Sequence, residues 1–180
     1  MNNLVPASPP KMDDEPGSDV KRFLATRGLL IMKEFHDIND IKCEYGVKIS
    51  MSTAIISTME SSTTPSRISF GLRFEMYEED VVRDSAFLDF DEFMEVAAAL
   101  EFIGSLSAKM LTEQRDYTEV NFITKDNIKF GFYQSDGRQL AFMNLDSYGE
   151  SAFLSMRTLD FVKQNIEYSK NYLISRGAKV

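Results

Sequence analysis

Ser85-Ala86-Phe87-Leu88 recurs letter for letter as Ser151-Ala152-Phe153-Leu154. Each copy is a short apolar stretch that leads into a segment with helical periodicity. At the same offset, apolar residues also correspond after the two copies, in the pairs Phe93 and Leu159, Val96 and Val162, Leu100 and Ile166, Leu106 and Tyr172. This internal match predicts a strand followed by a helix, used twice.

Alternating apolar and polar residues predict antiparallel strands before each copy. Apolar residues occupy odd positions over 41–55 and even positions over 68–76, which is the two-residue period of a strand with one buried face. The long first stretch is expected to bulge or turn at Gly46. In the second half, strands are predicted over 118–124, 128–134 and 138–145, and Asp136-Gly137 favours a tight hairpin turn between the last two.

Helices are predicted from Asp91 to about Leu111 and from Thr158 to about Ser175. Asp91 and Thr158 are the expected N-caps, and Gly177 follows the second helix. The order of four strands, a helix, four strands and a helix predicts an α+β fold, with two repeats of an antiparallel four-stranded sheet followed by a helix. Residues 21–180 are expected to form one domain with similar halves at about 27–111 and 116–177.

The length and composition of the chain indicate a globular protein with a polar, proline-rich start. The chain has 180 residues with 43% apolar content, enough for a core. Four of its five prolines fall in the first 16 residues, so residues 1–20 are predicted to be a disordered leader. The sequence shows no signal-peptide pattern and no apolar stretch long enough for a membrane span, which predicts a cytoplasmic protein without membrane contact.

Catalytic, metal and phosphate-loop spacings are absent from the sequence, so no catalytic residue, metal ligand or cofactor is predicted. His36 is interpreted as a surface turn residue, and the lone Cys43 as an inert strand residue. Residues 75–95 carry nine acidic residues against the single base Arg83. This run is either a solvated face with acids at a helix start, or a metal or docking site.

The first helix is apolar nearly all round. Met94, Ala98 and Phe102 are four residues apart and form a ridge on one face. The ridge is expected either to be an interface with another subunit or to lie at the centre of the single core. The first alternative predicts a homo-oligomer or a protein partner.

The doubled layout of four strands and a helix, with the Ser-Ala-Phe-Leu match before each helix, resembles the Whirly, PUR and PC4-like group of single-stranded nucleic-acid-binding proteins. The resemblance covers residues 28–175 and implies binding through a basic sheet face with exposed aromatic residues. Candidate contacts on the predicted sheet faces are Lys42, Lys48, Arg73, Lys129, Tyr133 and Arg138. A net charge of −8 opposes this function, because affinity for phosphate chains depends on Lys and Arg.

Three functions follow, in order of preference. The first is a non-catalytic interaction or self-assembly module. The second is a single-stranded nucleic-acid-binding protein. The third is an enzyme that uses the acidic residues near 75–95.

Overall fold

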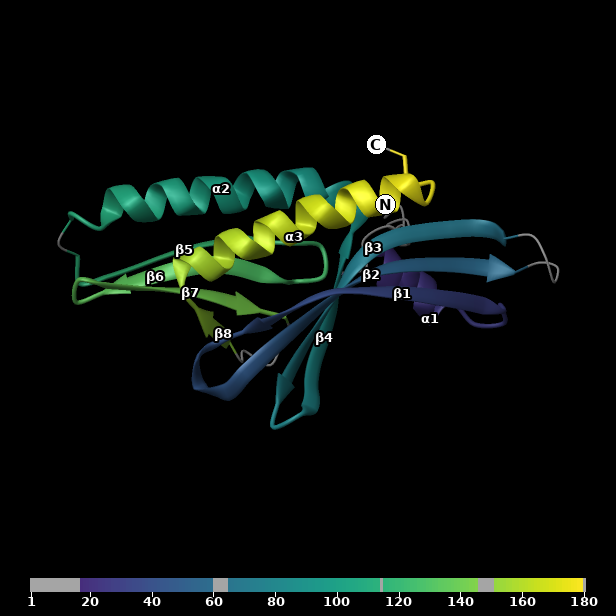
Figure 1. Cartoon of the computed structure of the whole chain (residues 1–180), viewed down its shortest axis with the longest axis horizontal. Coiled ribbons are helices and arrows are strands. Elements are labelled where there is room, and N and C mark those ends of the chain that lie inside the picture. The colour runs from purple at the N-terminus through teal and green to yellow at the C-terminus, as the bar shows by residue number, and fades with distance from the viewer. Residues whose placement is uncertain (1–16, 60–64, 114, 146–150, 180) are drawn as a thin grey trace, which may run out of the picture.

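The computed structural model describes residues 17–59, 65–113, 115–145 and 151–179. It contains two antiparallel four-stranded sheets and two long helices, as the α+β prediction requires (Figure 1). Sheet A comprises β1 (Ile31–Lys42), β2 (Val47–Met59), β3 (Pro65–Glu78) and β4 (Val81–Asp89). Sheet B comprises β5 (Tyr117–Ile123), β6 (Lys129–Ser135), β7 (Arg138–Asn144) and β8 (Ser151–Leu154). In both sheets each strand pairs with its neighbour in the sequence.

The two Ser-Ala-Phe-Leu copies lie in β4 and β8, the last strand of each sheet. Their alanines and leucines are buried, and the helix residues that match at the same offset, Phe93 with Leu159 and Val96 with Val162, are buried too. The two sheets nevertheless differ in size. Strands of 9 to 14 residues build sheet A, whereas strands of 4 to 7 residues build sheet B.

Tight turns define the hairpins. Asp136 and Gly137 have φ of 51° and 74°, so the predicted turn between β6 and β7 is confirmed, with Ser135 paired to Arg138. The predicted turn at Gly46 is confirmed as well. A short 3-10 segment, η2 (Glu44–Gly46), separates β1 from β2, and both Tyr45 and Gly46 have positive φ.

Both predicted N-caps are wrong. The segment η3 (Phe90–Glu92) precedes α2 (Phe93–Met110), and Asp89 caps it through a reciprocal capping box with Glu92. Ser155 caps α3 (Met156–Ser175), since its hydroxyl accepts the Thr158 N–H. The helical turns begin at Phe90 and Met156, three residues before Phe93 and Leu159, where the hydrophobic period of each helix begins. Gly177, with φ of 105°, follows α3 as expected.

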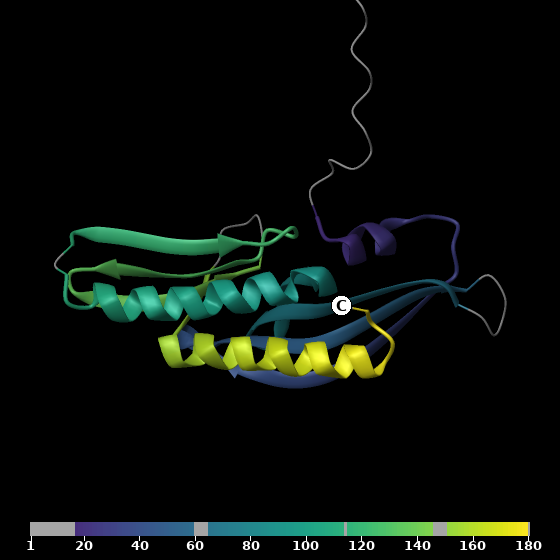
Figure 2. The same cartoon turned by 90° about the horizontal axis from the view of Figure 1, so that it is seen from above.

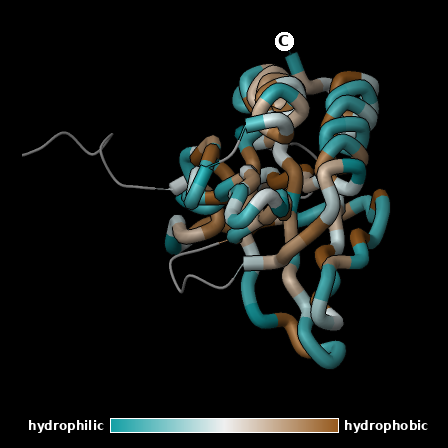
Figure 3. The backbone as a smooth tube through the Cα atoms, turned by 90° about the vertical axis from the view of Figure 1, so that its left-hand side faces the viewer, coloured by the Kyte–Doolittle hydropathy of each residue, from teal (hydrophilic) through white to brown (hydrophobic). Residues whose placement is uncertain are grey.

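The helices α2 and α3 lie antiparallel and side by side along the two sheets (Figures 1 and 2). Brown and teal segments alternate along both helices in Figure 3, as expected for helices with one buried face. We call the sheet faces toward these helices the inner faces and the opposite faces the outer faces.

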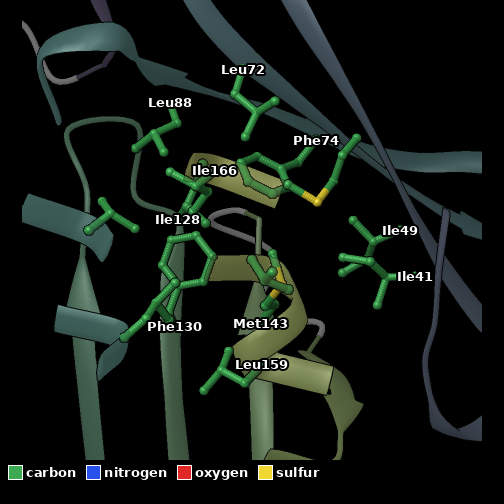
Figure 4. Close-up of a cluster of buried hydrophobic side chains, with 14 of the residues drawn as sticks. Ile41, Ile49, Leu72, Phe74, Leu88, Ile128, Phe130, Met143, Leu159 and Ile166 are labelled. Carbon is green, nitrogen blue, oxygen red and sulfur yellow. The ribbon is translucent and has the colours of Figure 1, made fainter. Parts of the chain in front are cut away.

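One hydrophobic core joins both sheets and both helices (Figure 4). Phe74 of sheet A meets Phe130 of sheet B edge to face, with 6.0 Å between ring centroids. Around this contact lie fully or almost fully buried side chains that include Ile49, Leu72, Leu88, Ile128, Phe132, Met143, Val162 and Ile166.

The predicted leader boundary requires correction. Residues 1–16 lie outside the described residues, but Ser18 and Val20 are completely buried. Ser18 caps α1 (Asp19–Ala25), which packs Val20 and Phe23 on the outer face of sheet A. Figure 2 shows α1 on the side of this sheet away from α3. A seven-residue helix carries too little hydrophobic period to be recognised next to a polar, proline-rich stretch.

Candidate functional site

The outward face of α2 is apolar and exposed. Met94 is 60% exposed and Phe102 is 66% exposed, with Ala98 exposed between them. On the opposite side of the helix, Phe93, Val96, Leu100 and Ile103 are buried in the core. The ridge of Met94, Ala98 and Phe102, which we call the α2 ridge, is therefore not interior in the single chain.

A groove between α2 and α3 runs beside the α2 ridge. Its cavity volume is about 460 Å³, and its lining mixes apolar residues with charged ones: Phe93, Met94, Ala97, Ala98, Glu101, Ile166, Glu167, Lys170 and Asn171. Lys170 Nζ lies 2.6 Å from Met94 Sδ, and Lys163 Nζ lies 3.6 Å from a Glu101 carboxylate oxygen. One ion pair, between Glu101 and Lys163, thus joins the two helices beside this groove.

Aromatic rings cross the outer face of sheet B in a continuous line. Tyr117 stacks with Tyr133 at 6.3 Å between ring centroids, and Tyr133 meets Phe153 edge-on at 6.1 Å. Phe153 in turn meets Tyr45, at the tip of the β1–β2 hairpin of sheet A, at 6.2 Å. We call these four residues the aromatic row.

The predicted nucleic-acid contacts are divided between two sheets. Lys129, Tyr133 and Arg138 lie on the outer face of sheet B, in register with the aromatic row. Lys42, Lys48 and Arg73 lie on the outer face of sheet A.

The cations of the two sheets also differ in their partners. In sheet A, Lys48 pairs with Asp40 at 3.4 Å, and Arg73 pairs with Glu75 at 3.2 Å and lies over the Phe35 ring. Within the part of the chain that the structure describes, Lys129 and Arg138 of sheet B have no ion-pair partner. Lys42 of sheet A also forms no ion pair among the described residues, so the predicted cations left for a ligand are Lys42 on sheet A and Lys129 and Arg138 beside the aromatic row.

The acidic run gathers three carboxylates at the start of α2. Ligand atoms of Asp89, Asp91 and Glu92 lie within 4.8 Å of one another. The cation that they hold in this structure is the Lys125 ammonium, 2.7 Å from Asp91 and 3.7 Å from Asp89. Asp89 also accepts the N–H groups of Asp19 and Val20, and Glu92 accepts those of Asp89 and Lys125.

These bonds give the buried carboxylates a structural role. Burial raises the pKa of Asp89 and of Glu92, although backbone N–H donors act in the opposite direction. Further along the β5–β6 turn, buried Asp126 accepts the Phe87 N–H at 2.9 Å and Lys21 Nζ at 3.0 Å. The turn of sheet B thereby holds α1 and strand β4 of the first half. We call this set of contacts the acidic clasp.

His36 and Cys43 support no catalytic arrangement. The His36 ring stacks on Tyr172 of α3 with 4.4 Å between ring centroids, so it packs a helix against β1 and is not a turn residue as predicted. Cys43 is half-buried, and burial together with the nearby Glu44 carboxylate raises the pKa of its thiol to about 11. The thiol is therefore protonated at neutral pH, in agreement with the interpretation of an inert residue.

Sequence reasoning missed three members of the aromatic row and the acidic clasp. Tyr117 and Tyr133 do stand at the outward positions of the β5 and β6 alternation, and Phe153 stands at the outward position of the second Ser-Ala-Phe-Leu copy. Those positions could have indicated three of the four rings. Tyr45 belongs to the other half of the chain, and no sequence period links it to them.

Comparison of the chain with protein-family models, with curated proteins and with solved structures finds no match in any of the three. Among the described residues, no helix is long and apolar enough to cross a membrane.

Proposed function

We propose that the protein is a non-catalytic interaction module that associates with a second copy of itself through α2. The observation that carries this proposal is the α2 ridge, whose Met94 and Phe102 are 60% and 66% exposed. Soluble proteins seldom leave large apolar side chains grouped on a helix without a partner. A self-complementary contact is the commonest way in which identical chains cover such a face.

A two-fold axis near Ala98 satisfies both the shape and the charge of this surface. With the two copies of α2 antiparallel, Phe102 of each copy faces Met94 of the other, beside the groove that Met94 and Lys170 line. Lys170 then approaches Glu101 of the second copy. Ala98 lies at the axis, where its small side chain lets the two helices approach closely.

Light scattering after size exclusion tests this proposal. The wild type should have twice the 20.5 kDa mass of one chain. Ala98→Glu places two carboxylates at the axis, so it should give a folded monomer with an unchanged circular dichroism spectrum. Ala108→Glu, at an exposed position near the end of the same helix, should remain dimeric. A wild type that is monomeric at all concentrations would contradict the proposal.

A second candidate function is single-stranded nucleic-acid binding, as the resemblance to the Whirly, PUR and PC4-like group implies. One observation favours it: Lys129 and Arg138 flank Tyr133 and Tyr117 on one sheet face. Bases could stack on these rings while the cations contact phosphates. The net charge of −8 opposes it.

Fluorescence anisotropy with a labelled oligonucleotide separates this candidate from the first. If the function is correct, binding weakens as salt rises, and Lys129→Gln or Arg138→Gln each lowers the log-log slope by about 0.7. Lys48→Gln is the control, because Lys48 pairs with Asp40 on sheet A. Absence of binding at low salt would eliminate this candidate and leave the dimer proposal untouched.

A further inference from the structure

The Tyr45 backbone is unusual for its residue type. Its φ and ψ are 57° and 28°, a left-handed conformation that favours Gly, Asn or Asp in a two-residue hairpin turn. Tyr in this position costs free energy, and the residue is 83% exposed. Because the strained conformation brings the ring to Phe153, the turn extends the aromatic row beyond sheet B.

The rest of the row lies beside Phe142, a buried residue on the same face of sheet B. A side chain at Gly131 would overlap the Val120 carbonyl oxygen, and it would lie 2.9 Å from the Phe142 ring. Glycine therefore lets the buried Phe142 ring lie against the sheet, next to Phe153 in the pairing. At the other end, the Tyr117 hydroxyl donates to Glu119 at 2.8 Å. The row is thus a surface of neighbouring rings with acidic residues near its two ends, Glu44 next to Tyr45 and Glu119 bonded to Tyr117.

Surfaces of neighbouring aromatic rings suit proline-rich segments. Such segments adopt the polyproline II helix, which loses little entropy on binding and packs its rings between aromatic side chains. The chain carries such a segment itself in Pro6-Ala7-Ser8-Pro9-Pro10, followed by Lys11. Lys11 has the charge that complements Glu44 or Glu119.

The described chain begins at the β5–β6 turn of sheet B. A side chain at Gly17 would lie 3.7 Å from Asp126, in the β5–β6 turn that leads into the strands of the row. Six residues lie between Pro10 and Gly17, and the seven Cα–Cα steps can span up to about 23 Å. Phe153 pairs with Phe142, which pairs with Gly131, three residues beyond Ile128. Measured from the β5–β6 turn, Phe153 therefore lies about 10 Å along the strands and about 15 Å across the four strands of sheet B.

We propose that Pro6–Pro10 docks on the aromatic row of its own chain. The tether makes docking an intramolecular event at a high effective concentration, so even a weak contact is populated. In this arrangement the leader covers the outer face of sheet B and competes with any other ligand of that face.

Paramagnetic broadening in the full chain tests the proposal. A nitroxide is attached at Asn3→Cys in a Cys43→Ser background, and amide signals are compared before and after reduction of the label. The amides of Tyr117, Tyr133 and Phe153 should lose intensity, whereas that of Thr58, at the end of β2 far from Tyr45, should not. Replacing Pro6, Pro9 and Pro10 together by alanine should restore the lost signals.

A row variant and a matched control complete the experiment. Tyr45→Gly removes the ring and relieves the strained backbone, so the protein should stay folded while the broadening decreases. Tyr168→Ala, an exposed tyrosine on α3, should leave the broadening unchanged. Unbroadened row amides, or broadening that survives the proline replacements, would overturn the proposal. Broadening in a mixture of labelled and isotope-enriched chains would overturn its intramolecular form.

Discussion

At the scale of single residues, the most informative group is the buried carboxylate of Glu92. It ties the start of α2 to the β5–β6 turn through the Lys125 N–H at 2.8 Å. Burial nevertheless raises its pKa above the ordinary value of 4.5. The Glu92 carboxylate can therefore hold the local geometry, although its ionised form is less favourable in the folded protein than in the unfolded chain.

This combination fixes the sign of a pH effect. Because the pKa of Glu92 is higher in the folded protein than in the unfolded chain, folding favours the protonated form. The stabilisation that this form gives is fully present below pH 4.5 and is lost as pH rises through the raised folded pKa. We expect the unfolding free energy of the wild type to fall relative to that of Glu92→Gln between about pH 4 and about pH 7. Urea titrations of both proteins across this range measure the difference. If the unfolding free energy of the wild type instead rises relative to that of Glu92→Gln, the N–H donors lower the pKa of Glu92 more than burial raises it.

At the scale of elements, α1 decides where the folded chain begins. Val20 is completely buried, and Asp19 and Val20 donate their N–H groups to Asp89. A chain that starts at Gly17 should keep the urea midpoint of the full chain. A chain that starts at Lys21 should lose about 2 kcal/mol or more, because it removes a buried Val and two of the N–H groups that donate to Asp89. Equal midpoints would show that α1 contributes nothing to stability.

Elements with a long, regular period could be predicted from the sequence, and elements that depend on tertiary partners could not. Strand β2 and the Asp136-Gly137 turn express local rules, and both are present, but β2 is buried on both faces where α1 packs on Ala54 and Ile56. The caps at Asp89 and Ser155 precede the hydrophobic period, and α1 is held by distant partners. For the same reason Met94, Ala98 and Phe102 could be placed on one helix face, whereas Tyr45 could not be placed beside Phe153.

At the scale of the whole molecule, the acidic clasp joins the two halves. Asp126 of the second half accepts hydrogen bonds from Phe87 and Lys21 of the first. Asp126→Ala should cost about 1 to 3 kcal/mol, because it leaves a buried N–H without an acceptor. Asp160→Ala, on the exposed side of α3, should cost less than about 0.5 kcal/mol. Chemical denaturation distinguishes the two variants, and similar costs would mean that the clasp does not couple the halves.

The strand order has a consequence for how the protein is made. Every strand pairs with its sequence neighbour, so sheet A can assemble by successive local hairpins while sheet B is still inside the ribosome. The inner face of sheet A, with Leu72 and Phe74, is then uncovered until α2 and α3 emerge. We expect nascent chains that stop before α3 to need chaperone protection, and the synthesis of α3 to end that exposure.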